Sequence, residues 1–134
     1  MPAYNTNLAA EFHVLSVLHR LGVDANLTLG NKKSVDIAVI RGEGDSITID
    51  VKGLEGKTGW PIDNVKPGKA KHFIVFVCFH GKIAEPSVSP LVWVVPSMDI
   101  TGLAYSAPGG RKLMTVSTLK AKGSAYENAW SLIT

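Results

Sequence analysis

Apolar positions near the start of the chain recur with the period of an α-helix. From Leu8 to Leu21 most apolar residues are three or four positions apart, which predicts an amphipathic helix. Asn5 or Thr6 is suited to cap its beginning, and Gly22 is suited to end it. The predicted apolar face consists of Leu8, Phe12, Val14, Leu15, Leu18 and Leu21.

Short apolar segments bounded by turn residues follow this helix and predict β-strands. The expected strands are Ala25 to Leu29 (closed by Gly30-Asn31), Ser34 to Arg41, Ser46 to Lys52, His72 to Phe79 and Leu91 to Val95. The last two are apolar at nearly every position, as in strands covered on both faces of a sheet. Between them and the first three, Gly53 to Lys71 is rich in Gly, Pro and Lys and is expected to be a long loop.

The end of the chain is expected to be helical. Pro96-Ser97-Met98-Asp99 predicts a short helical turn with Ser97 as its cap. Ser124 to Leu132 predicts a closing helix that packs Tyr126 and Trp130. The order of elements predicts an α/β sandwich around a mixed sheet, built as a single domain over residues 1–134.

Composition indicates the class of protein and its location in the cell. Of the 134 residues, 46% are hydrophobic and 19% charged, which is typical of a globular protein and not of a disordered chain. The longest apolar run, Phe73 to Phe79, is too short for a membrane-spanning helix. Met1 to Thr6 contains no basic segment followed by an apolar one, as an export signal would. Cys78 is the only cysteine and is expected in the core. A cytoplasmic location is expected.

The charge distribution mildly favours an anionic partner. The formal net charge is +3 and the pI is near 9.1. Lysines cluster at Lys32-Lys33 and at Lys66, Lys69 and Lys71. Each cluster alone is consistent with a solvated loop, whereas several clusters around one acidic centre would suit a polyanion.

Glu11 interrupts the apolar arc of the predicted first helix. On a helical wheel it lies between Leu15 and Leu18. An ionised carboxylate that faces a core is costly unless it is paired or bound to a cation. The alternative is that the helix end frays and Glu11 reaches solvent.

Two aspartates are expected to face each other across the predicted hairpin. Gly42-Glu43-Gly44 suits a three-residue loop with Gly44 in the left-handed conformation, and this loop pairs Arg41 with Asp45. Counting back from that pair places Asp36 opposite Asp50, with Cβ atoms roughly 5 Å apart. Lys52 emerges on the same face of the strand as Asp50.

This group of residues has the chemistry of a magnesium site. Carboxylate oxygens are the hard ligands that Mg²⁺ prefers, and a nearby ammonium can orient water and offset charge on a phosphate. The alternative is an ordinary charge ladder, in which Lys52 is simply paired with Asp50 and Asp36.

The order of these residues resembles that of the PD-(D/E)xK nuclease superfamily, and most of all the small nucleases related to Holliday-junction resolvases. The resemblance covers about the first 53 residues: Glu11 in the helix, Val35-Asp36 in one strand, and Asp50-Val51-Lys52 after a hairpin. Val35 replaces the proline of the motif, at a position that varies in the family. The resemblance implies a restriction-endonuclease-like fold with α-β-β-β-α-β order and an extra C-terminal helix.

The resemblance also implies roles. Asp36, Asp50 and the main-chain carbonyl of Val51 would bind Mg²⁺ (or Mn²⁺), with Glu11 completing the shell, and Lys52 would activate water. The implied reaction hydrolyses a phosphodiester bond of DNA and leaves a 5′-phosphate and a 3′-hydroxyl. Lys32, Lys33, Lys57, Trp60, Lys69 and Lys71 are candidate contacts to nucleic acid.

Several residues have more than one interpretation. Trp60 could stack on a base or could anchor the long loop to the core. The four histidines, His13, His19, His72 and His80, lack metal-binding spacing and are expected at the surface or at strand ends, where His72 could lie near a phosphate.

Two functions are therefore compatible with the sequence. The first is a metal-dependent endonuclease, which would need a homodimer to cut both strands of a duplex. The second is a catalytically idle module that binds nucleic acid or a protein partner. Nothing in the sequence distinguishes DNA from RNA as the substrate.

Overall fold

The computed structural model describes residues 4–28, 36–65 and 67–134. The helices are α1 (Thr6–Arg20), α2 (Ile100–Leu103) and α3 (Val116–Lys122), with 3₁₀ turns η1 (Ser97–Asp99), η2 (Ser124–Tyr126) and η3 (Trp130–Leu132). The strands are β1 (Asp24–Leu27), β2 (Ile37–Gly42), β3 (Asp45–Leu54), β4 (Gly59–Pro61), β5 (His72–Cys78), β6 (Leu91–Pro96), β7 (Tyr105–Ser106) and β8 (Lys112–Thr115).

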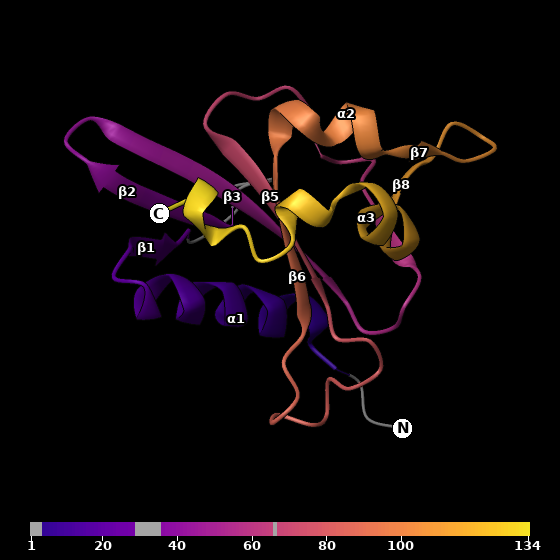
Figure 1. The fold of residues 1–134 in the computed structure, drawn as a ribbon, viewed down its shortest axis with the longest axis horizontal. Coiled ribbons are helices and arrows are strands. Elements are labelled where there is room, and N and C mark those ends of the chain that lie inside the picture. The colour runs from indigo at the N-terminus through magenta and orange to yellow at the C-terminus, as the bar shows by residue number, and fades with distance from the viewer. Residues whose placement is uncertain (1–3, 29–35, 66) are drawn as a thin grey trace.

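A mixed five-stranded sheet forms the centre of the molecule (Figure 1). Its strand order is β1-β2-β3-β5-β6; β3 and β5 are parallel, and the other neighbours are antiparallel. A second, three-stranded sheet has the order β4-β8-β7. The expected α/β class with a central mixed sheet is confirmed.

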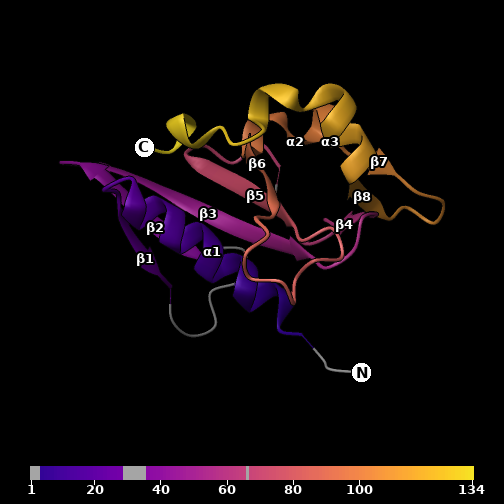
Figure 2. The ribbon, with the colours of Figure 1, turned by 60° about the horizontal axis from the view of Figure 1, so that its bottom comes forward.

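Helix α1 covers one face of the central sheet, and α2 and α3 lie over the other (Figure 2). Hydrophobic residues pack on both faces. On one face, Val14 and Leu18 of α1 pack against apolar side chains of β2 and β3 such as Ile37. On the other face, Phe76 of β5 packs with Leu119 of α3 and with residues of the second sheet. Val75 and Val77 point to the first core while Ile74, Phe76 and Cys78 point to the second, which explains why β5 is apolar throughout.

The buried face of α1 differs from the predicted one. Ala10, Val14 and Leu18 are fully buried, whereas Leu8 is 47% exposed and Phe12 52% exposed. The prediction weighed apolar size alone, but the small Ala10 is the residue that allows α1 to lie close to β3. Leu21, 52% exposed, is also outside the core.

The hairpin between β2 and β3 has the predicted register from Ile37 to Ile40 but not at its turn. Ile37 pairs with Ile49 and Ala38 with Thr48, and Gly44 has a φ of +74°. The register shifts between Ile40 and Gly42, so that Gly42 and not Arg41 pairs with Asp45 in the backbone. The side chains of Arg41 and Asp45 still form an ion pair, with Nε 3.1 Å from Oδ2.

The expected α-β-β-β-α-β order is wrong. Among the described residues that connect β3 to β5 there is no helix; this segment contributes β4, which pairs with β8. Helix α3 was not predicted, although Thr115 caps it by accepting a hydrogen bond from the Thr118 N–H at 3.1 Å. Ser97 does not cap η1; its hydroxyl accepts from the backbone N–H of Lys69 at 3.0 Å.

The predicted closing helix is also absent, because residues 124–132 form the two turns η2 and η3. Asn128 between them has a φ of +52°, and its N–H donates to the carbonyl of Val92 at 2.9 Å. Glu127 forms an isolated bridge with Trp93. In this segment, contacts with Val92 and Trp93 of β6 therefore take the place of a continuous helix.

Some predictions fall outside the described residues: Leu29, the Gly30-Asn31 turn, Lys32, Lys33, Ser34, Val35 and Lys66. Within the described ranges, no helix has the length and apolar character needed to cross a membrane.

Candidate functional site

Among the described residues, the second half of β3 has no strand neighbour on the β2 side. Pairing between β2 and β3 ends at Ile37 and Ile49, so the N–H groups of Val51 and Gly53 need other partners. The Asp36 carboxylate accepts from the Val51 N–H at 2.7 Å, and the Asn7 amide oxygen accepts from the Gly53 N–H at 3.0 Å. Two side chains thus accept the N–H groups on this edge of β3.

Gly53 allows α1 to approach this unpaired edge. A Cβ atom on Gly53 would lie 2.8 Å from the Thr6 carbonyl oxygen and 3.0 Å from the Ala10 Cβ. Any larger residue would therefore push the beginning of α1 away from β3. This contact brings Glu11, the residue after Ala10, to the edge of β3 near Asp36 and Asp50.

Asp50 lies on the sheet face expected for it. The parallel register pairs Asp50 with Ile74 and Lys52 with Phe76, and both of these partners belong to the second core. Ile49 and Val51 point to the opposite core. The predicted alternation along β3 is therefore confirmed.

Burial and neighbouring charges perturb the acidic residues. Asp50 is only 4% exposed, and its pKa is raised to about 7. The main cause is burial, and Asp36 adds to it through a hydrogen bond and through its negative charge. Glu11 adds to this rise in the pKa of Asp50, while Lys52 opposes it. Burial and the Asp36 charge also raise the pKa of Glu11. The structure thus brings Glu11, Asp36 and Asp50 close enough to act on one another.

Lys52 connects the acidic group to a pocket. Its Nζ lies 3.8 Å from Asp50 Oδ2 and donates a hydrogen bond to Asn64 Oδ1 at 3.1 Å. The pocket has a volume of about 330 Å³ and is lined by Asn7, Lys52, Gly53, Trp60, Pro61, Asp63 and Asn64. Asn7 and Asn64 were not predicted, because nothing in the local sequence distinguishes them from other surface amides.

The donor chemistry of the site fits a divalent cation. Asp50 Oδ2 is buried and has no hydrogen-bond partner among the described residues, and two further carboxylates lie nearby. Carboxylates grouped in this way repel one another unless a proton or a cation lies between them. No group of three or more His, Cys, Asp or Glu residues in the described ranges has the spacing of a preformed metal site. Binding would therefore draw Glu11, Asp36 and Asp50 closer together.

His72 lies in the same region, at the beginning of β5, which is one of the two places expected for it, but it is buried. It is 3% exposed, and its Nδ1 is hydrogen bonded to Thr48 Oγ1 at 2.6 Å. Burial and the Lys69 charge lower its pKa to about 4, while Thr48 and the Asp36 charge act in the opposite direction. The imidazole is therefore neutral near pH 7.

The candidate nucleic-acid contacts are dispersed. Lys69 is exposed and acts on His72, whereas Lys71 pairs with Asp45 at the far end of β3, with Nζ 3.7 Å from Oδ1. Trp60 is 2% exposed, and its ring centroid lies 5.0 Å from that of Phe76. A ring buried in this way has no face for base stacking, so Trp60 anchors the loop. Lys57 is exposed and lines a different pocket.

The fold and the site together define an α/β protein in which a buried aspartate, two neighbouring carboxylates and a lysine gather at the second half of strand β3. Comparisons with protein-family models, with curated proteins and with solved structures gave no match for the chain. The function is therefore inferred from the site itself.

Proposed function

We propose that this chain is a Mg²⁺-dependent nuclease, which hydrolyses phosphodiester bonds of DNA. The proposed fold is restriction-endonuclease-like but has no helix among the described residues between β3 and β5. The observation that carries the proposal is the buried Asp50, whose Oδ2 has no hydrogen-bond partner in the described part of the chain and which lies among Asp36, Glu11 and Lys52. An ionised carboxylate in such a place is costly without a compensating cation. A site that retains this cost is more often functional than structural.

The proposed metal ligands are Asp36, Asp50, the main-chain carbonyl of Val51 and Glu11. A bound Mg²⁺ or Mn²⁺ ion would supply Lewis-acid polarisation of the phosphate and a more acidic water. Asp36 already accepts the Val51 N–H, which orients its carboxylate toward β3. Ionisation of Asp50 would accompany metal binding, because its pKa of about 7 keeps it partly protonated otherwise.

Lys52 is proposed to hold the attacking water and to offset the charge that develops on the phosphate. Its ammonium reaches Asp50 on one side and the Asn64 amide on the other, at the wall of the adjoining pocket. Both contacts restrict the side chain, and such restriction favours positioning of a nucleophile. The pocket is the proposed place for the nucleotide next to the scissile bond.

The test is cleavage of supercoiled and branched DNA with Mg²⁺, with Mn²⁺ and with EDTA. We expect metal-dependent cleavage that Asp50→Ala and Lys52→Ala reduce at least about 10³-fold, an effect of about 4 kcal/mol on the barrier. Lys82→Ala is the matched control, since Lys82 pairs with Glu85 on a distant loop. Undiminished cleavage by either variant would exclude the mechanism, and an RNA substrate tested in parallel identifies the nucleic acid.

The second candidate is the catalytically idle module, in which the group formed by Glu11, Asp36 and Asp50 holds a proton and binds no metal. The raised pKa of Asp50 is the observation that favours it, because a shared proton can replace the cation. Calorimetric titration with Mg²⁺ separates the two candidates. A nuclease binds the ion with release of a proton, whereas an idle module shows no binding and no cleavage.

A further inference from the structure

A second pocket, separate from the carboxylate centre, has walls that carry positive charge. It has a volume of about 330 Å³ and is lined by Lys57, Cys78, His80, Leu91, Val116 and Lys120. Lys57 belongs to the segment between β3 and β4, His80 follows β5, and Lys120 belongs to α3. No acidic residue is among its described lining residues.

The two lysines of this pocket are not neutralised. Within the part of the chain that the structure describes, the ion pairs involve Arg41, Lys52, Lys71, Lys82 and Arg111, and neither pocket lysine has a carboxylate within ion-pair distance. Both ammonium charges act on the Cys78 thiol. Burial raises the pKa of this thiol, and the two charges partly oppose that rise. The two positive charges therefore lie near Cys78, which also lines the pocket.

Backbone contacts fix the walls of the pocket in advance. The N–H groups of Phe79 and Gly81 donate to the carbonyls of Leu54 and Glu55 at 2.8 and 2.7 Å. Cys78 Sγ donates to the Gly56 carbonyl at 3.2 Å. His80 holds a φ of +39°, which a non-glycine residue keeps only where its surroundings require it. The segment before β4 and the end of β5 thus form one rigid rim.

We propose that the pocket between Lys57, His80 and Lys120 binds a phosphate group. Two uncompensated ammonium groups around a small hollow are donors that suit a tetrahedral oxyanion. His80 lines the hollow, and its ring is held by Nε2, which donates to the Ser89 carbonyl at 3.3 Å. Leu91 and Val116 supply apolar walls that limit competition from water.

The position of the pocket favours nucleic acid as the source of this phosphate, and that part of the inference rests on the proposed function. The parallel register pairs Lys52 with Phe76 and Leu54 with Cys78. Cys78 is therefore one strand across and two residues along from Lys52, roughly 8 Å away by strand geometry, on the same face of the sheet. A nucleic-acid strand that has one phosphate at the carboxylate centre could place another of its phosphates in this pocket.

The test begins with inorganic phosphate and is independent of cleavage. Two-dimensional ¹H–¹⁵N NMR spectra are recorded in EDTA as potassium phosphate replaces potassium chloride at constant ionic strength. We expect saturable shifts at the amides of Lys57, Cys78, His80 and Lys120. Lys57→Gln and Lys120→Gln should each weaken binding at least about fivefold, and the double variant should abolish it. Lys122→Gln, on the same helix but outside the pocket, should bind like the unmodified protein.

A duplex DNA of about 20 base pairs, also in EDTA, identifies the source. If the pocket holds a backbone phosphate, the plot of log affinity against log salt concentration should be less steep for the double variant, by about 0.9. If the double variant loses inorganic phosphate but binds the duplex with an unchanged slope, the pocket serves a free phosphate compound. Saturable shifts that survive in the double variant, or no saturable shifts at all, would overturn the site. Loss of cleavage in Lys52→Ala with phosphate binding intact would separate the two proposals.

Discussion

At the scale of single residues, Asp50 combines the features that matter for function. It lies in a strand between Ile49 and Val51, which fill the opposite core, and its own carboxylate is buried with no described hydrogen-bond partner for Oδ2. Folding therefore favours the protonated form of Asp50 when no cation is present. That preference has a measurable effect on stability, because protonation and folding are linked.

The first prediction concerns the pH dependence of this effect. The pKa of Asp50 is about 7 in the folded protein, against 3.8 for an ordinary aspartate. Its contribution to stability is thus present below about pH 4 and lost as the pH rises to 7. The asparagine side chain of an Asp50→Asn variant does not titrate. In EDTA we therefore expect the free energy of unfolding of this variant, relative to that of the unmodified protein, to increase by about 2–4 kcal/mol as the pH rises from about 4 to 7.

Urea denaturation at several pH values measures this difference. His72 titrates in an overlapping range with the opposite sign, since its lowered pKa makes it stabilising above its ordinary pKa, but it is present in both proteins and cancels. Asp63→Asn is the control: the pKa of Asp63 is lowered by Lys112 and Arg111, so its removal should not stabilise the protein as the pH rises. Parallel curves for Asp50→Asn and the unmodified protein would contradict the burial of an acidic Asp50.

At the scale of elements, the site depends on how α1 meets β3. Among the described residues, strand β2 begins only at Ile37, and the beginning of α1 lies beside the half of β3 that follows Ile49. Gly53 is the residue that permits this arrangement, because a Cβ atom there would lie 2.8 Å from the Thr6 carbonyl. The helix is thereby tied to the strand next to Lys52, and the Asn7 side chain satisfies the Gly53 N–H.

We therefore expect Gly53→Ala to destabilise the protein by about 1–3 kcal/mol through overpacking against backbone. Because the displaced helix carries Glu11, DNA cleavage should also fall more than the loss of folded protein explains. Thermal unfolding and cleavage at a temperature where the variant is folded measure the two effects. Gly56→Ala is the matched control, since a Cβ at Gly56 meets no described atom within 4 Å. Equal stability of the two variants would refute the close approach.

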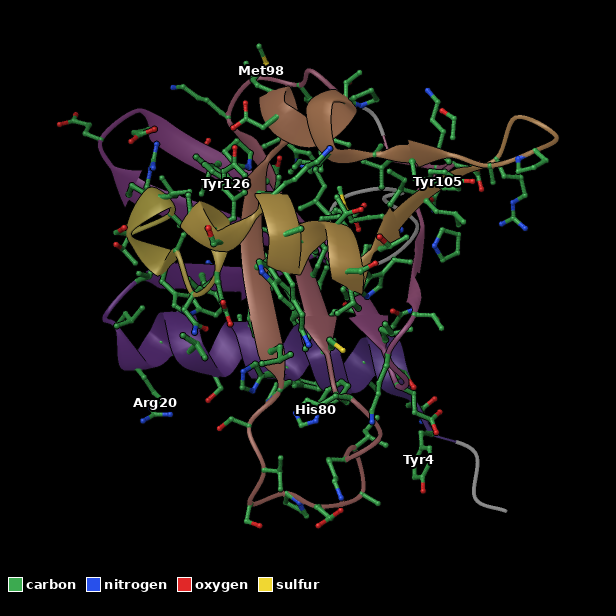
Figure 3. The ribbon with its side chains drawn as sticks, turned by 45° about the vertical axis from the view of Figure 1, so that its right-hand side comes forward. Tyr4, Arg20, His80, Met98, Tyr105 and Tyr126 are labelled. Atoms are coloured by element: carbon green, nitrogen blue, oxygen red, sulfur yellow. The ribbon has the colours of Figure 1, made fainter. Side chains whose placement is uncertain are left out.

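At the scale of the whole molecule, one sheet separates two apolar cores that different parts of the chain build. The N-terminal half supplies most of the first core, and the second core adds β4, β8, α2 and α3 on the opposite face. The exposed side chains drawn in Figure 3, such as Met98 and Tyr105, belong to the outer layer over the second core. Strands β3 and β5 contribute to both cores, so the cores should unfold together.

This predicts a single cooperative transition. Leu18→Ala in the first core and Leu119→Ala in the second should each cost about 2–5 kcal/mol, because both side chains are fully buried. For each variant, tryptophan fluorescence and far-ultraviolet circular dichroism should give the same midpoint in urea. Leu8→Ala, at an exposed position of α1, should change stability by less than about 0.5 kcal/mol. Separate midpoints in either core variant would indicate two folding units.

The local pattern of the chain was sufficient to predict some elements and not others. The helix, the hairpin register and the alternation of Asp50 and Lys52 follow from neighbouring residues and are confirmed. Strand β4, with three residues, is too short to show any periodicity. Helix α3 carried one recognisable signal, the Thr115 cap, but its apolar residues did not indicate a face.

By itself the sequence determined which side chains of β3 share a face, because the period of a strand is set by the backbone. Only the tertiary structure decided that Asn7 lies 3.0 Å from the N–H of Gly53, 46 positions away, and that Glu11 lies near Asp36 and Asp50. Such contacts depend on where a strand stops and which segment fills the space beside it. That choice is made by packing between distant segments, which local propensity does not encode.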